Sequence, residues 1–214
     1  MKLKIAPSLL SANLLNLERE IKNIEKAGAD MLHLDIMDGH FVPNLTFGPE
    51  LVKQIRKTTN LPLDTHLMVT NPAFFIPKFL ESGVDYISFH IETNSKYEKL
   101  LNAIKKSKVK AGVAINPETP LNTVGKILDY IDYVLIMTVH PGFGGQEFIA
   151  DCTPKIQELH KIVGKRKIEI EVDGGINYQT AKLVKEAGAN IIVAGNFIFN
   201  SKNYKKVIEG LRNV

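Results

Sequence analysis

The sequence has little of several features that mark specialised protein classes. It has one cysteine, Cys152, among 214 residues, so neither an intrachain disulfide nor a zinc site of paired cysteines is expected. No hydrophobic run approaches the roughly 18 residues of a membrane-spanning helix, and the basic residues form no tract for nucleic acid. Its 15 glycines and 10 prolines are average usage, which excludes collagen-like and disordered chains. A soluble protein of the cytoplasm, without membrane or nucleic-acid partners, is predicted.

Composition and length predict an ordinary globular domain. Of the residues 44% are hydrophobic, which is enough for a full core at this length. Lysine and arginine number 27 against 23 acidic residues, and the net charge of +4 is compatible with a small anionic substrate. No linker or low-complexity stretch divides the chain, so residues 1–214 are expected to form a single domain.

Short β-rich runs alternate with longer amphipathic runs along the whole chain. The runs typical of strands are residues 4–9, 31–35, 63–68, 86–90, 110–115, 133–139, 168–173 and 191–194. The runs with helical periodicity are residues 14–27, 49–58, 73–82, 96–107, 121–131, 153–163, 178–187 and 204–211. Three of these helices end in Ala-Gly or Ser-Gly just before the next strand, at Gly28, Gly83 and Gly188. Eight repeated βα units predict an α/β fold, a parallel eight-stranded (β/α)8 barrel.

Alternation along each strand separates inward from outward side chains, because residues two apart share a face. Leucines 32 and 34 would face the helices, which leaves His33 and Asp35 facing the barrel interior. By the same count the other inward residues are Ser8, Asp64, His66, Met68, His90, Asn116, Met137, Glu171 and Asp173. Many of them lie near the carboxyl ends of their strands, where barrels of this kind build their active sites.

Two imidazoles and two carboxylates converge among these inward residues. His33, Asp35, His66 and Asp173 are predicted to bind one divalent cation, and the set suits zinc, ferrous iron, manganese or cobalt. A single buried histidine or aspartate more often only completes a hydrogen bond. Four together, with no lysine or arginine at the ends of those strands, would leave buried carboxylates without a cation.

Glycine-rich segments follow the last three strands and predict a phosphate site. The candidates are Gly142, Phe143, Gly144, Gly145, Gly174, Gly175, Gly195 and Asn196. Backbone N–H groups of such loops approach anions closely, and phosphate sites of these barrels commonly follow strands seven and eight. The alternative is that the glycines only make tight turns. No GxGxxG or GxxxxGK[ST] motif is present, so no nucleotide cofactor is expected.

Three methionines, Met37, Met68 and Met137, lie near strand ends. Methionine is usually a flexible core filler. At this rim, however, an apolar lining would keep water away from a reactive intermediate.

The motifs resemble those of the ribulose-phosphate 3-epimerase family, in the same order and over the whole chain. The matching blocks are IAPSLLSA (5–12), HLDIMDGHFVPN (33–44), DTHLM (64–68), NPETP (116–120), PGFGGQ (141–146) and EVDGG (171–175). Two positions depart from the family pattern. His140 stands where Asn, Asp or Glu is more common, and Asn196 stands where a small hydroxyl residue is common.

The resemblance implies an isomerase of the pentose phosphate pathway that interconverts D-ribulose 5-phosphate and D-xylulose 5-phosphate with one divalent metal. It implies that Asp35 and Asp173 are the acid/base pair and metal ligands and that His33 and His66 complete the metal site. Ser8 and His66 would contact the sugar. The glycine loops and Asn196 would hold the phosphate, the three methionines would cap the intermediate, and the chain would form a homo-oligomer.

Inversion of a carbon next to a ketone independently requires an acid/base group on each face of the substrate, and strands two and seven can supply them. Two alternatives remain open from the sequence. One is a 3-epimerase of another ketose phosphate, such as D-allulose 6-phosphate. The other is a barrel that only binds sugar phosphates.

Overall fold

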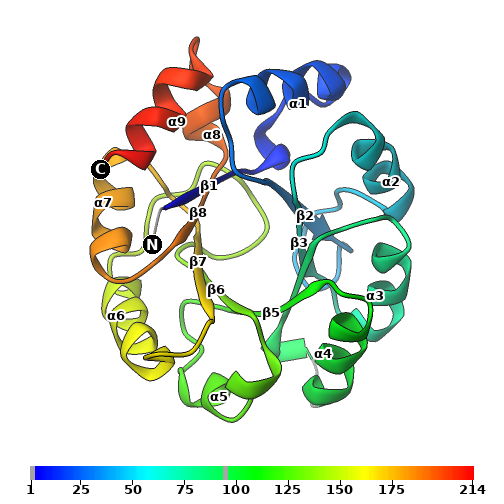
Figure 1. Ribbon diagram of the computed structural model, residues 1–214, viewed down its shortest axis with the longest axis vertical. Coiled ribbons are helices and arrows are strands. Elements are labelled where there is room, and N and C mark those ends of the chain that lie inside the picture. Colours follow the sequence, from blue (N-terminus) through cyan, green and yellow to red (C-terminus); the bar gives the residue numbers. More distant parts are fainter. Residues whose placement is uncertain (1–2, 94–95) are drawn as a thin grey trace.

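The computed structural model describes residues 3–93 and 96–214, which form a barrel of parallel strands surrounded by helices (Figure 1). The strands are β1 (Lys4–Pro7), β2 (Leu32–Met37), β3 (Leu63–Met68), β4 (Tyr86–His90), β5 (Lys110–Ile115), β6 (Tyr133–Met137), β7 (Glu169–Asp173) and β8 (Ile191–Ala194). All eight predicted strands are present, and their ends differ from the sequence-based ranges by at most two residues. The predicted (β/α)8 fold is therefore confirmed.

The helices follow the strands one by one. They are α1 (Leu17–Lys26), α2 (Pro49–Thr58), α3 (Pro72–Leu80), α4 (Tyr97–Lys106), α5 (Asn122–Gly125), α6 (Cys152–Val163), α7 (Tyr178–Glu186), α8 (Asn196–Phe199) and α9 (Tyr204–Arg212). Four 3₁₀ turns accompany them: η1 (Leu9–Ser11), η2 (Leu14–Asn16), η3 (Ile91–Thr93) and η4 (Leu128–Tyr130). Within the described residues, no helix has the length and apolar character needed to cross a membrane.

One helix prediction was wrong. The stretch 121–131 is not continuous: α5 ends at Gly125, and the 3₁₀ turn η4 follows. Its apolar residues Leu121, Val124 and Ile127 are spaced by three and are all buried. A spacing of three suits the 3₁₀ geometry of 3.0 residues per turn as well as an α-helix, and a glycine inside the stretch disfavours the longer helix. The short helix α8, by contrast, was not predicted.

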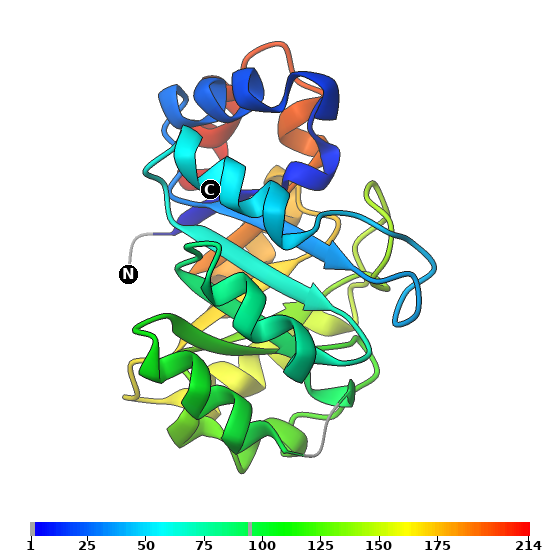
Figure 2. The same cartoon turned by 90° about the vertical axis from the view of Figure 1, so that its right-hand side faces the viewer.

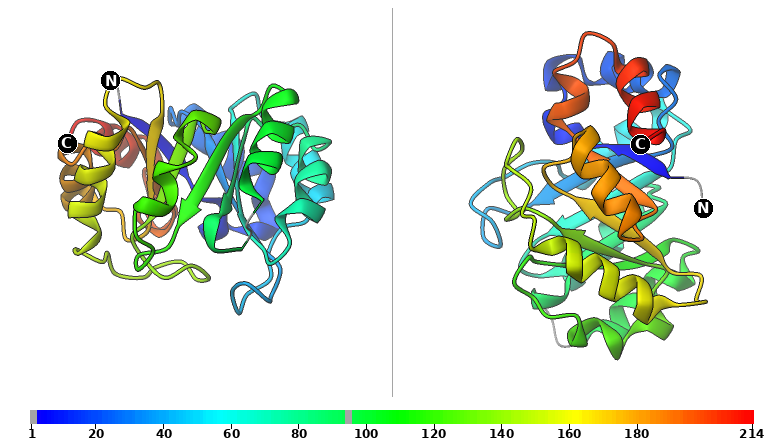
Figure 3. Two further views of the ribbon diagram at one scale, coloured as in Figure 1. Left: turned by 90° about the horizontal axis from the view of Figure 1, so that it is seen from below. Right: turned by 90° about the vertical axis from the view of Figure 1, so that its left-hand side faces the viewer.

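The strands pair in the order β1-β8-β7-β6-β5-β4-β3-β2, every pair parallel. Between β1 and β2 a single parallel bridge, from Ser8 to His33, brings the two edges of the sheet together. Parallel pairing directs every carboxyl end to one rim. Figure 2 shows the arrowheads of β2 and β3 directed toward the side from which the loops after β2 and β6 project, and Figure 3 shows the same rim from two other directions.

The core has two layers. The larger layer lies between the strands and the surrounding helices, and the outward residues Leu32 and Leu34 belong to it, as predicted from alternation. A smaller cluster around Met31 and Ile191 fills the barrel below the polar residues. The glycines predicted to end α1, α3 and α7 have φ between +80° and +113°, the left-handed conformation in which a helix commonly ends, and they precede β2, β4 and β8. Both layers fix the strands that carry the site.

Candidate active site

Strand register brings the four predicted metal ligands together at the carboxyl rim. Asp35 of β2 pairs in register with His66 of β3, and His33 lies two residues earlier on β2. Asp173 ends β7 on the opposite side of the barrel. One ligand atom from each of His33, Asp35, His66 and Asp173 lies within 4.8 Å of all the others.

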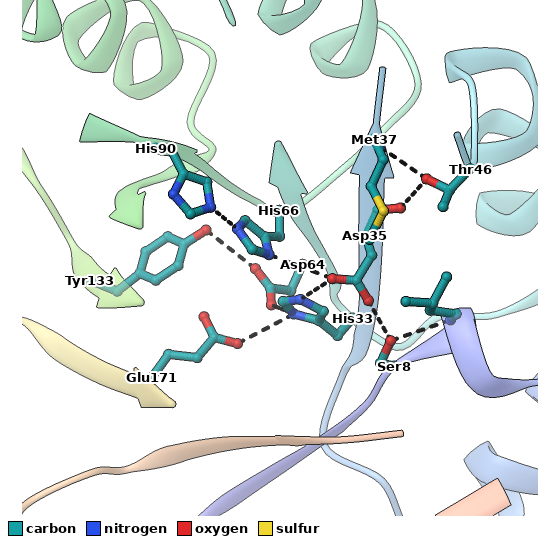
Figure 4. A network of polar contacts seen from close by, with 11 residues as sticks. Ser8, His33, Asp35, Met37, Thr46, Asp64, His66, His90, Tyr133 and Glu171 are labelled. Atoms are coloured by element: carbon teal, nitrogen blue, oxygen red, sulfur yellow. Dashed lines mark hydrogen bonds and ion pairs between the residues drawn. The ribbon is translucent and has the colours of Figure 1, made fainter. Parts of the chain in front are cut away.

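The two imidazoles turn different nitrogens toward Asp35 (Figure 4). His33 Nε2 is 3.4 Å and His66 Nδ1 is 3.5 Å from Asp35 Oδ1. Both nitrogens are buried and have no hydrogen-bond partner among the described residues. Two unpartnered imidazole nitrogens beside two carboxylates fit a divalent cation, since such a cation would satisfy all four groups at once.

His33 is fixed from behind by a second buried carboxylate. Its Nδ1 lies 2.5 Å from Asp64 Oδ2, and the Tyr133 hydroxyl donates to Asp64 Oδ1 over 3.2 Å. Glu171 Oε1 lies 3.5 Å from the same His33 nitrogen. Strand alternation predicted that Asp64 and Glu171 face inward but assigned them no role. Tyr133 was not predicted to belong to the site. Alternation alone did not signal this role for Asp64, because its position opposite His33 depends on the strand register seen in the structure.

The two carboxylates at the rim have opposite proton affinities. Burial disfavours the charge of Asp35, but the neighbouring His33 and His66 rings outweigh it and hold the pKa of Asp35 far below its usual value. Burial and the nearby charge of Asp35 raise the pKa of Asp173 to about 7. Near neutral pH, Asp35 is therefore ionised, whereas Asp173 can carry a proton.

The pKa values of the two histidines also differ. Burial lowers the pKa of His66 to about 4, so this ring is neutral and has a free lone pair. Burial acts in the same direction on His33, but the charges of Asp35 and Asp64 outweigh it and raise the pKa of His33 well above its usual value. The negative charge around His33 is the environment that favours a bound cation.

An open cavity of about 650 Å³ lies above this cluster. It is lined by the carboxylates Asp35 and Asp173, whereas His33 and His66 lie buried beneath it. All the residues predicted to bind substrate or cap the intermediate, other than His66, also line it: Ser8, Met37, Met68, Met137, Gly142, Phe143, Gly144, Gly145, Gly174, Gly175, Gly195 and Asn196. Strand alternation and loop position thus brought these residues to one cavity.

Ser8 contacts the Asp35 carboxylate directly. Its hydroxyl donates to Asp35 Oδ2 over 2.5 Å, and the Ser8 hydroxyl oxygen itself accepts from the Leu10 backbone N–H. The Asp35 main chain is held as well, because the Thr46 hydroxyl donates to its carbonyl over 2.5 Å. These bonds fix the Asp35 carboxylate at the edge of the cavity.

Several glycines of these loops leave no room for a side chain. A Cβ at Gly175, whose φ is +65°, would lie 2.4 Å from the Phe148 backbone nitrogen. A Cβ at Gly195 would lie 2.4 Å from the Ser11 hydroxyl oxygen. The loop after β6 is also tethered over the cavity, since the Asn44 side-chain amide donates to the Gly142 carbonyl over 2.8 Å. The glycine backbone is therefore closely packed against neighbouring segments at the edge of the cavity.

The apolar part of the lining comes from two sides of the barrel. Met37 and Met68 pack with Val42 in one cluster, and Met137 packs with Val139 in another. All three methionines are almost fully buried. The rim therefore has polar groups below and polarisable, apolar groups around the space where a substrate would lie.

Comparison with known proteins identifies the family. Residues 4–199 match the model of the ribulose-phosphate 3 epimerase family. The chain is 48% identical to ribulose-phosphate 3-epimerase of Bacillus subtilis, covering 98% of both chains. It is 46% identical to that of Synechocystis, covering 98% of this chain and 93% of the relative. Among solved structures, 3-keto-L-gulonate-6-phosphate decarboxylase from Vibrio cholerae is similar in fold, with a TM-score of 0.77 at 17% identity over 100% and 97% of the chains.

Proposed function

Since this chain belongs to the ribulose-phosphate 3-epimerase family and is thus an isomerase, we propose that it interconverts D-ribulose 5-phosphate and D-xylulose 5-phosphate by two-base, metal-assisted proton transfer at C3. The observation that carries the proposal is the pair of rim carboxylates. Asp35 and Asp173 come from β2 and β7, and both reach one cluster with His33 and His66. Carboxylates from opposite sides of a barrel can address both faces of one substrate carbon.

Each carboxylate has one task in each direction of the reaction. Asp35 removes the C3 proton from one face of the ketose, and Asp173 delivers a proton of its own to the other face. The product leaves Asp35 protonated and Asp173 ionised, which is the state required for the reverse direction. The Ser8 hydroxyl, which donates to Asp35, holds the carboxylate in place for this transfer.

The donor set fits a divalent cation held by His33, Asp35, His66 and Asp173. When bound, such a cation supplies Lewis-acid stabilisation for the negative charge that the enediolate develops on its oxygens. Zinc, ferrous iron, manganese and cobalt all accept two nitrogens and two carboxylates.

The remaining cavity residues bind and shield the substrate. Backbone N–H groups of the loops at Gly142–Gly145, Gly174–Gly175 and Gly195–Asn196 are proposed to hold the phosphate. Met37, Met68 and Met137 are proposed to keep water from the enediolate, so that the proton returns from Asp173 and not from solvent.

The test is proton NMR of the protein with D-ribulose 5-phosphate in deuterium oxide, with and without a chelator. Appearance of xylulose 5-phosphate with deuterium at C3, lost on chelation and restored by zinc, is expected. Exchange at C3 without inversion would contradict the two-base assignment. Absence of exchange with metal bound, but turnover of D-allulose 6-phosphate, would contradict the proposed substrate. We also propose a cytoplasmic location and a homo-oligomeric state, the latter tested by sedimentation velocity.

A further inference from the structure

A relay of two side chains, the buried His90 and the partly exposed Glu92, lies behind His66 on the side away from Asp35. His66 Nε2 is 2.8 Å from His90 Nε2, and His90 Nδ1 is 3.2 Å from Glu92 Oε2. His90 ends β4, and Glu92 lies in the turn η3 that follows it. Figure 4 shows the His90 ring beside His66 at the side of the cluster away from Ser8. None of the reaction steps proposed above uses these two residues.

We propose that His90 and Glu92 are positioning residues that fix His66 in the tautomer whose Nδ1 is free to bind the metal. The inference rests on the metal site of the proposed function. In this relay, His66 Nε2–H donates to His90 Nε2, and His90 Nδ1–H donates to the Glu92 carboxylate. Reversal of that direction would place a proton on His66 Nδ1, where the metal has to bind.

The direction of both hydrogen bonds follows from Glu92, the acceptor at the end of the relay. Glu92 Oε1 accepts the Asn116 backbone N–H over 2.9 Å and also accepts the Thr119 hydroxyl. Although burial favours its neutral form, the hydrogen bond from His90 and the bonds from Asn116 and Thr119 lower the pKa of Glu92 to about 2. A carboxylate only accepts hydrogen bonds, so the nitrogen that is hydrogen-bonded to it, His90 Nδ1, has to carry a proton.

The proton between the two rings then belongs to His66. Only one of the two nitrogens that face each other over 2.8 Å can carry it. A proton on both nitrogens of His90 would place a positive charge on a ring that is 0% exposed, which burial disfavours. His90 Nε2 is therefore the acceptor and His66 Nε2 the donor. The neutral His66 ring keeps its lone pair on Nδ1, the atom that faces Asp35 without a hydrogen-bond partner among the described residues.

The end of the relay is firmly anchored. The Lys155 ammonium donates to the carbonyls of Asn116 and Thr119 over 3.2 and 2.8 Å, which holds the loop that binds Glu92. The Phe41 ring lies 4.6 Å from the His90 ring, and the His66 ring stacks on the same imidazole at 5.0 Å with a 30° interplanar angle. His90 consequently has neighbours that fix its ring plane as well as its two nitrogens.

The other histidine ligand, His33, also has a hydrogen-bond acceptor behind it, but with the roles of the two ring nitrogens exchanged. His33 turns Nε2 toward the ligand cluster and gives Nδ1 to the Asp64 carboxylate over 2.5 Å. Each ligand therefore has an acceptor behind it that selects the nitrogen left for the metal, directly for His33 and through His90 for His66. Acceptors of this kind orient metal-binding imidazoles and raise metal affinity.

The decisive variant is Glu92→Gln, because the amide has almost the same shape but can reverse the relay. If its oxygen accepts from Asn116 and Thr119, its NH₂ group faces His90 Nδ1 and forces that nitrogen to accept. His90 Nε2 then carries the proton, and His66 is driven to the tautomer with Nδ1–H. Glu118→Gln is the matched control, since Glu118 lies in the same loop, is exposed and contacts His140 over 3.4 Å.

Two measurements are made on the intact protein. The first is the tautomer of His66, from imidazole ¹⁵N shifts without added metal, with the signal assigned by its loss in His66→Asn. The second is zinc affinity by competition with a chelator. We expect the proton on Nε2 in the parent protein, a shift toward Nδ1 in Glu92→Gln, and zinc binding about tenfold weaker in that variant. Glu118→Gln should match the parent in both.

Two results would overturn the relay: a proton on Nδ1 of His66 in the parent protein, or a Glu92→Gln variant whose tautomer and zinc affinity match the parent. His90→Phe is a second variant, which keeps an aromatic ring but removes both nitrogens, and it should weaken zinc binding about 10- to 100-fold. Failure of the parent protein to bind any divalent cation would contradict the proposed function instead. The tautomer measurement still tests the relay in that event, because it needs no metal.

Discussion

A single methyl group added at Gly112 tests whether the floor of the site is as tightly packed as the structure indicates. Gly112 lies on β5 in register with Tyr133 of β6. A Cβ at this position would lie 2.4 Å from two atoms of the Tyr133 ring, and real Cβ contacts are essentially never that short. Tyr133 is fully buried and has to move if Gly112 becomes alanine.

The cost of Gly112→Ala has two parts. Overpacking a rigid core costs about 1–3 kcal/mol. Displacement of the Tyr133 hydroxyl from Asp64, 3.2 Å away, removes a hydrogen bond to a charged group, worth about 1.5–3 kcal/mol. We therefore expect a loss of about 2.5–6 kcal/mol in the free energy of unfolding, which for this chain length lowers the melting temperature by roughly 5–24 °C. Weaker zinc binding should accompany it, because Asp64 holds His33.

The assay is thermal and urea unfolding followed by circular dichroism, and Gly125→Ala is the matched control. A Cβ at Gly125 in α5 meets nothing within 4 Å, and its φ is not positive. That variant should be as stable as the parent or more stable by up to about 1 kcal/mol. In a double-mutant cycle, Tyr133→Leu should relieve part of the Gly112→Ala penalty. A Gly112→Ala protein that melts within about 2 °C of the parent would refute this account of the barrel floor.

Three further predictions concern the rim. Asp173→Asn, loaded with zinc, should lower the epimerisation rate about 100- to 10,000-fold, and near-normal turnover by NMR would contradict its role as proton carrier. Chelation should lower both activity and melting temperature, because the cation offsets the repulsion between Asp35 and Asp173. Added zinc should restore both. Full activity and an unchanged melting curve in the presence of chelator would contradict the metal site. Asp38→Asn should lose about 1.5–3 kcal/mol at pH 7, because Asp38 accepts the backbone N–H groups of His40, Phe41 and Thr70. Burial favours the neutral form of Asp38, but these bonds lower its pKa to about 2. The stability that Asp38 contributes is therefore complete above the unfolded pKa of about 4 and is lost as the pH falls through about 2. A difference in urea unfolding between parent and variant that stays the same at about pH 2 would contradict this.

Strand and helix positions were predictable because each strand carries a strong local signal. The runs at β3, β4, β5 and β8 were predicted with their observed ends. The stretch 121–131 was not, since its apolar spacing fits two short turns as well as one helix. Local patterns thus define elements wherever one periodicity is clearly dominant.

The sequence by itself determined which side chains enter the barrel, because strand alternation has a period of two and His33, Asp35, His66 and Asp173 all follow it. Strand register, which sequence periodicity leaves open, set Asp64 opposite His33. Only the tertiary structure decided which nitrogen of each histidine faces the cluster. That choice depends on acceptors from other strands and loops, such as Asp64 and the His90–Glu92 pair, and hydrogen-bond direction is a property of contacts in space.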